Sequence, residues 1–200
     1  MKRFLLLLTM ATGLAADPLS QRDRDFAMSA LHASRKALID AVSGLSPAQA
    51  KFKAAPEKWS IFEIAEHLAM TEVFLRNNVG QMLKQPAAPE KKELVKGNDE
   101  LMLKTIASRE QKVQAPAPLA PKATFPSLAA ALAAFKAERM KTVQYVESTG
   151  DPLREHFVDN FGPGGKPADA YQMLLLLAAH TDRHVAQINE VKAAAGYPKK

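Results

Sequence analysis

Cysteine is absent from the 200 residues of this sequence. A chain without thiols forms no disulfide bonds, so its stability has to come from packing alone. The same absence removes thiolates as catalytic nucleophiles or metal ligands, and it argues against a haem or a lipid attached through cysteine. Histidine, aspartate and glutamate remain as the side chains that could build a functional site.

Long hydrophobic runs are scarce too, and the run near the start of the sequence is short. Lys2 and Arg3 precede an apolar run over residues 4–10, and small residues follow over residues 11–16. This order is typical of a secretory signal peptide. The run is too short to cross a bilayer as a permanent helix. A buried N-terminal helix is the alternative, which the flanking residues disfavour.

We therefore expect residues 1–16 to be a cleaved signal peptide and residues 17–200 to be one mature domain, periplasmic or secreted, without a stable membrane anchor. Removal of two basic residues and no acidic residue lowers the net charge from +6 to +4. The remaining lysines are scattered, whereas nucleic-acid binders gather positive charge into a stripe. We predict no nucleic-acid partner.

Alternating apolar and polar residues over the length of a strand are also missing, so no sheet is predicted. Four long segments instead carry apolar residues at helical spacing, and proline-rich or glycine-containing breaks separate them. With 47% hydrophobic residues, the chain can bury one sizeable core. We predict an all-α up-down four-helix bundle whose core helices cover residues 19–42, 61–85, 128–150 and 167–196.

The connection between the second and third core helices is long. It holds a polar helical stretch over residues 91–111, which Gly97 weakens, and a proline-rich extended part over residues 114–126. The second core helix has the clearest start, because Ser60 and Glu63 have the spacing of a capping box.

Three histidines occupy the apolar stripes of two predicted helices. His180 and His184 lie one turn apart in the fourth core helix, and His67 lies on the stripe of the second. A buried imidazole needs partners for both ring nitrogens, and a shared divalent cation would satisfy one nitrogen of each ring. We interpret the three as metal ligands. Histidines hydrogen-bonded within a metal-free core are the alternative.

Residues 59–68 (WSIFEIAEHL) and 180–188 (HTDRHVAQI) together resemble the DinB-like superfamily. The resemblance covers most of the mature chain. It implies a four-helix bundle with a divalent metal ion, often zinc or nickel, held by one histidine of the second core helix and two of the fourth. Carried over to this sequence, the ligands would be His67, His180 and His184.

The resemblance also implies a range of functions. Characterised members include thiol-dependent S-transferases and isomerases, and others are described as metal-dependent hydrolases. His156 with Gly162 and Pro163 looks like the histidine and Gly-Pro approach to the last helix of the family.

Three neutral imidazoles would leave a divalent ion with its full charge and an open position for water or an anionic substrate atom. Thr181 follows His180 where the zincin motif requires glutamate, which argues against protease chemistry of that kind. The catalytic residues stay unknown. Candidates to assist the ligands, each with a structural reading as helix cap or surface ion-pair residue beside it, are Glu63, Thr71, Glu138, Arg139 and Asp182.

Two classes of function remain open. The first is an exported metal-dependent enzyme, a hydrolase or a thiol-dependent transferase, that acts on an unidentified small molecule. The second is a non-catalytic bundle that binds a metal ion or a small ligand. An open coordination position beside a pocket would favour the first, and a fourth protein ligand would favour the second. A homodimer is compatible with either.

Overall fold

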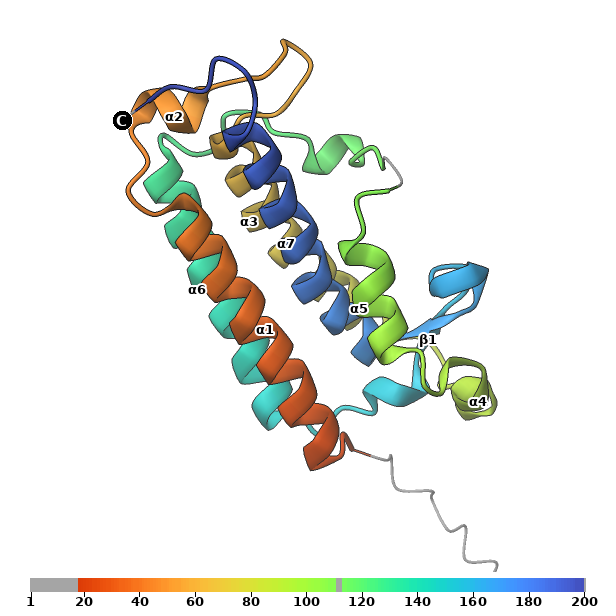
Figure 1. The fold of residues 1–200 in the computed structure, drawn as a ribbon. Helices are drawn as coiled ribbons and strands as arrows, with labels where there is room; N and C mark the ends of the chain where they lie inside the picture. Colours follow the sequence, from red (N-terminus) through yellow and green to blue (C-terminus); the bar gives the residue numbers. More distant parts are fainter. Residues whose placement is uncertain (1–17, 111–112, 200) are drawn as a thin grey trace, which may run out of the picture.

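The computed structural model describes residues 18–110 and 113–199, so the predicted signal peptide lies outside the described residues. Four long helices pack side by side (Figure 1) and confirm the predicted all-α bundle. They are α1 (Gln21–Val42), α3 (Ile61–Met82), α6 (Leu128–Ser148) and α7 (Ala170–Lys192). Among the described residues, no helix has both the length and the apolar character that a membrane span requires.

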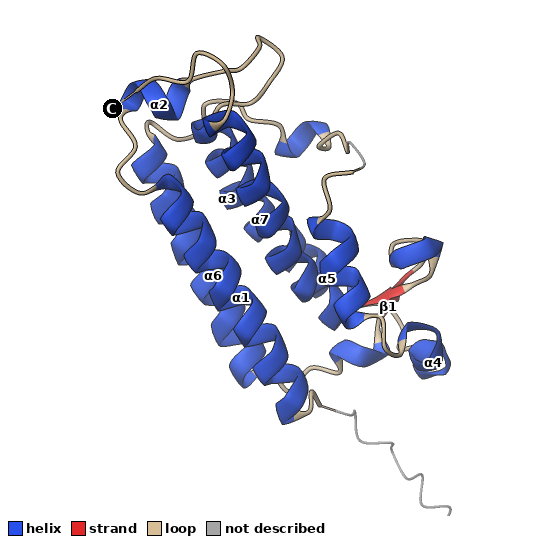
Figure 2. Ribbon diagram, in the orientation of Figure 1, coloured by secondary structure: helices blue, strands red, loops and turns tan. Residues whose placement is uncertain are grey.

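Short elements occupy the connections (Figure 2). They are α2 (Pro47–Lys51), η1 (Pro89–Lys91), α4 (Lys92–Val95), α5 (Asp99–Ala107), η2 (Ala117–Leu119), η3 (Leu153–Glu155), β1 (Phe157–Val158), η4 (Pro163–Gly165) and β2 (Ala168–Asp169). The predicted polar helix over residues 91–111 is two helices, because Gly97 takes a positive φ of 75° between α4 and α5.

The long connection sets the direction of the helices. After α3 the chain returns to the end of the bundle where α3 began, so α6 runs parallel to α3 (Figure 1). α1 and α7 are also parallel, since the Tyr171 hydroxyl donates to the Asp23 carbonyl at 2.8 Å near one end and Lys192 donates to the Ala41 carbonyl near the other. The directions of α1, α3, α6 and α7, in that order, are therefore up, down, down and up.

The start of α3 matches the sequence prediction. The Ser60 hydroxyl accepts the Glu63 amide at 3.2 Å, and the Glu63 carboxylate accepts the Ser60 amide at 2.7 Å. This reciprocal pair is a capping box, which satisfies two amides at the helix end. It also marks the residue at which the helix begins.

The predicted start of the last helix at Pro167 is wrong, as is the prediction of no strand. Ala168 and Asp169 form β2, which pairs antiparallel with β1. Asp169 then caps α7 by accepting the Gln172 amide at 2.7 Å. The pairing takes Pro167 out of the helix, and the helix ends at Lys192, before Gly196.

A polar layer crosses the middle of the bundle and separates two apolar clusters. On each core helix one polar residue of this layer lies between the residues that belong to the two clusters. The layer residues are Ser34 of α1, Glu72 of α3, Arg139 of α6 and Thr181 of α7, all buried. One cluster surrounds Leu174 and the other surrounds Ile64, on the side of the layer where α3 begins.

Candidate metal centre

The three histidines meet between α3 and α7. His67 is 2% exposed and His184 is 7% exposed, while His180 is partly accessible. The helical register explains this, because His180 and His184 are one turn apart on one face of α7 and His67 faces them from α3. The structure therefore brings together all three histidines that the sequence singled out.

The rings converge through their Nε2 atoms. His180 Nε2 lies 3.2 Å from His67 Nε2 and 3.1 Å from His184 Nε2. Across the cluster, one nitrogen from each ring lies within 4.8 Å of the others. Nitrogens bound to one tetrahedral zinc ion at about 2.0–2.1 Å would be about 3.3 Å apart. The two separations from His180 Nε2 are close to that value.

Two of the rings are oriented through their other nitrogen. His67 Nδ1–H donates to the Leu119 carbonyl at 2.8 Å, and a carbonyl can only accept. His184 Nδ1–H donates to the Gln187 side-chain oxygen at 2.8 Å. Both neutral rings therefore carry their hydrogen on Nδ1 and direct the lone pair of Nε2 into the cluster.

With these tautomers, His180 Nε2 is the only one of the three converging nitrogens that can carry a hydrogen. The single Nε2 of His180 can donate a proton to His67 or to His184 but not to both. With three neutral rings, at least one of these contacts at 3.1–3.2 Å then brings a lone pair against a nitrogen with no hydrogen between the two atoms. A cation among the three nitrogens would remove this repulsion, so the donor set fits a divalent metal ion.

Burial keeps the rings neutral. It lowers the pKa of His67, and burial followed by the nearby His67 ring lowers the pKa of His184 to about 3. Burial, then the His184 and His67 rings, holds the pKa of His180 well below its ordinary value. Neutral imidazole is the form that binds metal ions, so the cluster is ready for a cation at neutral pH.

Trp59, the residue before the N-cap of α3, packs against the histidine cluster. Its ring lies 5.0 Å from the His67 ring, centroid to centroid, and stacks on His184 at 6.2 Å and 17°. It is the sole tryptophan in the sequence, so its fluorescence reports on the cluster.

Arg139 is not the surface residue that the sequence suggested. It is fully buried and binds Glu72, with Nε 2.9 Å from the carboxylate, and it donates to Ser34 Oγ at 2.7 Å and Thr181 Oγ1 at 2.8 Å. A buried guanidinium needs this many acceptors to offset its loss of water. The network ties all four core helices together next to His180.

The other candidates from the sequence lie outside the cluster. Glu63 is occupied as a cap, and the Thr71 hydroxyl donates to the His67 carbonyl at 2.8 Å. Glu138 pairs with Arg76 and Lys141, as a surface ion-pair residue would. Asp182 is exposed.

His156 is not part of the cluster either. It is 6% exposed beside β1, and its carbonyl accepts the Ala170 amide at 2.9 Å where α7 begins. Sequence reasoning missed Leu119 and Gln187 as the partners of the ligands. Gln187 could have been found from its spacing three residues after His184 on the same helix, whereas nothing local marks Leu119.

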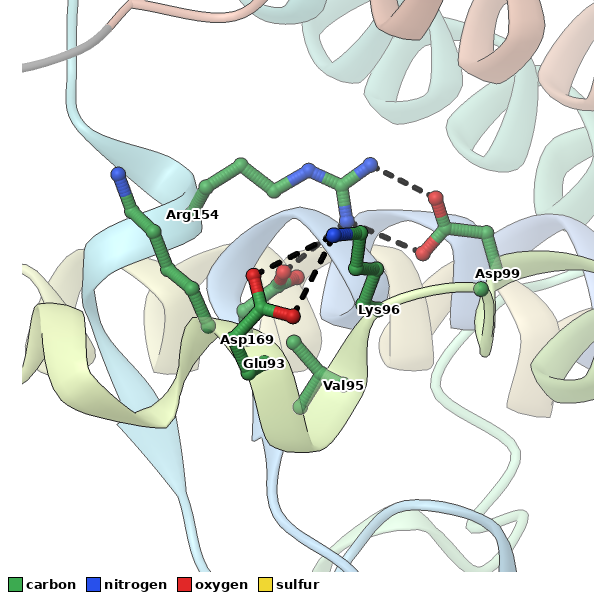
Figure 3. A pocket seen from close by; sticks show the side chains of 8 residues that line it. Glu93, Val95, Lys96, Asp99, Arg154 and Asp169 are labelled. Atoms are coloured by element: carbon green, nitrogen blue, oxygen red, sulfur yellow. Dashed lines mark hydrogen bonds and ion pairs between the residues drawn. The ribbon is translucent and has the colours of Figure 1, made fainter.

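A second polar site lies near the start of α7, and it is a cluster of ion pairs. Arg154 donates to Asp99 at 2.7 Å, to Asp169 at 3.0 Å and to Asp23 at 2.8 Å. Figure 3 shows the guanidinium between Asp99 and Asp169 in a pocket beside α4. These contacts join α1, α5 and the cap of α7, so the cluster is explained by structure.

The chain is thus a four-helix bundle with a cluster of three histidines between its second and last core helices. The sequence pattern of the DinB superfamily matches residues 30–188. The chain therefore belongs to the DinB superfamily.

A solved structure has a similar fold. It is YfiT from Bacillus subtilis, described as a probable metal-dependent hydrolase with an unusual four-helix bundle topology. The TM-score is 0.54 at 14% sequence identity, over 91% of this chain and 93% of YfiT. At this identity the likeness concerns the fold. None of the curated proteins compared matches the chain.

Proposed function

We propose that this protein is an exported metal-dependent hydrolase whose single divalent ion is bound by Nε2 of His67, His180 and His184. One observation carries the proposal. The hydrogen bonds from Nδ1–H of His67 and His184 direct two lone pairs at His180 Nε2, at 3.2 and 3.1 Å, in an arrangement that three neutral rings alone cannot satisfy.

The residues of this chain have defined tasks in the proposal. The Leu119 carbonyl and the Gln187 side chain hold two rings in the metal-binding tautomer. Burial keeps all three rings neutral, so the ligands add no negative charge. A divalent ion held in this way acts as a Lewis acid toward a water molecule or a substrate atom. Imidazole ligands suit zinc and nickel.

Hydrolysis is favoured over thiol transfer by the proposed export. Compartments outside the cytoplasm are oxidising, and the chain itself contains no cysteine, so a thiol substrate would have to be supplied there in reduced form. The description of YfiT, a protein of the same fold, as a probable metal-dependent hydrolase is consistent with this choice.

A closed, non-catalytic metal site is the second candidate, and the burial of the cluster favours it. His67 is 2% exposed and His184 is 7% exposed, so only the side of His180 offers access in this conformation. In this alternative the ion stabilises the fold, as structural zinc does.

The test compares zinc-loaded and nickel-loaded mature protein on a panel of esters, amides and phosphoesters. We expect one substrate class to be hydrolysed by wild type and by His32→Ala, a change at an exposed histidine, and not by His180→Ala. A loaded protein that binds one ion tightly and hydrolyses nothing would support the closed site. Hydrolysis that His180→Ala retains would overturn the proposal.

A further inference from the structure

One segment of the long connection lies against the candidate metal centre. We call residues 117–124 the strap. It begins with the turn η2, which contacts α3, and Leu119 at the end of that turn is 7% exposed. Figure 1 shows the connection crossing the end of the bundle between α5 and α6. The Leu119 carbonyl in the strap accepts the His67 Nδ1–H, so the strap orients one of the proposed ligands.

Glu66, the neighbour of His67 on α3, holds the other part of the strap. Its side chain is fully buried, and its Oε1 accepts the amides of Lys122 at 2.9 Å and Thr124 at 2.8 Å. Between these amides, Ala123 has a positive φ of 57°. Successive amides turned inward by such a residue form a concave site for an anion, which the carboxylate fills.

The closed strap carries two costs. Glu66 Oε2 is buried and has no hydrogen-bond partner in the part of the chain that the structure describes. A buried carboxylate oxygen without a donor is unfavourable, and so is a positive φ at an alanine. Both costs disappear when the strap lifts, because water then reaches Oε2 and Ala123 is free to relax. These costs offset part of the stability that the two hydrogen bonds to Glu66 give the closed strap.

We propose that Glu66 is a positioning residue that latches the strap, and that the strap is a lid over the three histidines. The latch keeps the Leu119 carbonyl on His67 and limits access to the cluster. Release of the latch breaks the contact with His67 and opens that side of the cluster. The inference rests on the proposed metal site. It assigns a second opening for the ion and a small-molecule substrate, in addition to the access on the side of His180.

The experiment compares wild type with Glu66→Ala, Glu66→Gln and Glu63→Ala. Zinc-loaded protein is mixed with an excess of chelator, and the release of zinc is followed through Trp59 fluorescence. We expect Glu66→Ala to release zinc about tenfold faster, roughly the effect of losing one charge-assisted hydrogen bond. Glu66→Gln keeps an oxygen that can accept the two amides, so its release rate should lie closer to that of wild type.

Glu63→Ala is the matched control for a loss of stability. Glu63 is a carboxylate one turn earlier on α3 that caps the helix and does not bind the strap. This variant should lower the thermal midpoint and leave the release rate within about twofold of wild type. If Glu63→Ala accelerates release as much as Glu66→Ala, the effect of Glu66 is only one of stability and the latch is wrong.

Trypsin provides a readout that needs no metal ion. Lys122 and Ala123 lie on the exposed side of the strap, and cleavage between them requires the strap to leave Glu66. In the metal-free protein, mass spectrometry should show this cut appearing about tenfold faster in Glu66→Ala than in wild type or Glu63→Ala. Equal cleavage rates would overturn the latch.

The two readouts separate the latch from the metal site. If wild type binds no zinc and Glu66→Ala accelerates the cut at Lys122, the proposed metal site fails and the latch stands. If zinc binds and Glu66→Ala changes neither release nor cleavage, the metal site stands and the latch fails.

Discussion

At the scale of single residues, the protonation of the three imidazoles decides what the cluster can bind. Burial lowers the pKa of each ring below the ordinary value of 6.5, and that of His184 to about 3. The unfolded chain takes up protons near pH 6.5, whereas the folded protein resists them. The stabilising contribution of these neutral rings is therefore complete above pH 6.5 and is lost as the pH falls toward the folded pKa.

We predict that the metal-free protein loses stability between pH 6.5 and pH 5, and that His184→Gln loses about 1–2 kcal/mol less over this interval. Urea unfolding at the two pH values measures the difference. His32→Gln, at an exposed position, should show the same loss as wild type. An identical loss in His184→Gln would contradict the lowered pKa.

At the scale of elements, the polar layer joins the four core helices through one guanidinium. Arg139 of α6 contacts Glu72 of α3, Ser34 of α1 and Thr181 of α7. Removal of one member of such a pair leaves an uncompensated buried charge, while removal of both does not.

Arg139→Met should therefore destabilise the fold by about 3–5 kcal/mol, and the double variant Glu72→Leu with Arg139→Met should recover most of that loss. Equilibrium unfolding of the two single variants and the double variant closes the cycle. Additive losses in the double variant would show that the pair is not coupled.

The start of a helix could be predicted when the residues that define it are close together in the sequence. The start of α3 was predicted because Ser60 and Glu63 are three residues apart and cap the helix locally. The start of α7 was not, because β2 pairs with β1 across a turn before Asp169 caps the helix. Tertiary pairing of this kind leaves no local pattern in the sequence.

The candidate site, too, could be predicted only in part. The three histidines could be predicted because helical spacing places them on apolar stripes. Burial of Arg139 was missed, because an arginine on a stripe looks like a surface residue until its acceptors on three other helices are known. The roles of Leu119 and Glu66 were missed because the strap reaches α3 only in the folded chain.

At the scale of the whole molecule, the bundle has two apolar clusters with the polar layer between them, and the histidines lie on the side where α3 begins. Because the chain contains no cysteine, these apolar clusters have to stabilise the domain without disulfides in the oxidising compartment where we expect it. The strap lies on that same side and contacts His67, so access from the side of His67 depends on the long connection.

Export remains a prediction at this scale. We expect mature protein recovered from the periplasm or the medium to begin near Ala16 or Asp17, because residues 1–16 have the order of a signal peptide. N-terminal sequencing tests this. An intact Met1 on protein found only in the cytoplasm would contradict it.

The central claim is that His67, His180 and His184 bind one divalent ion as a unit. It is tested most directly by metal content and thermal midpoint, with and without a chelator, in wild type and in each single alanine variant. We predict one zinc or nickel ion per wild-type chain and a lower midpoint after chelation, because binding energy that exists only in the fold is folding energy. Each variant should lose both the ion and the response to chelator, and His32→Ala should keep both. If wild type holds no stoichiometric metal and melts identically after thorough chelation, the three histidines are hydrogen-bonded core residues and the claim is wrong.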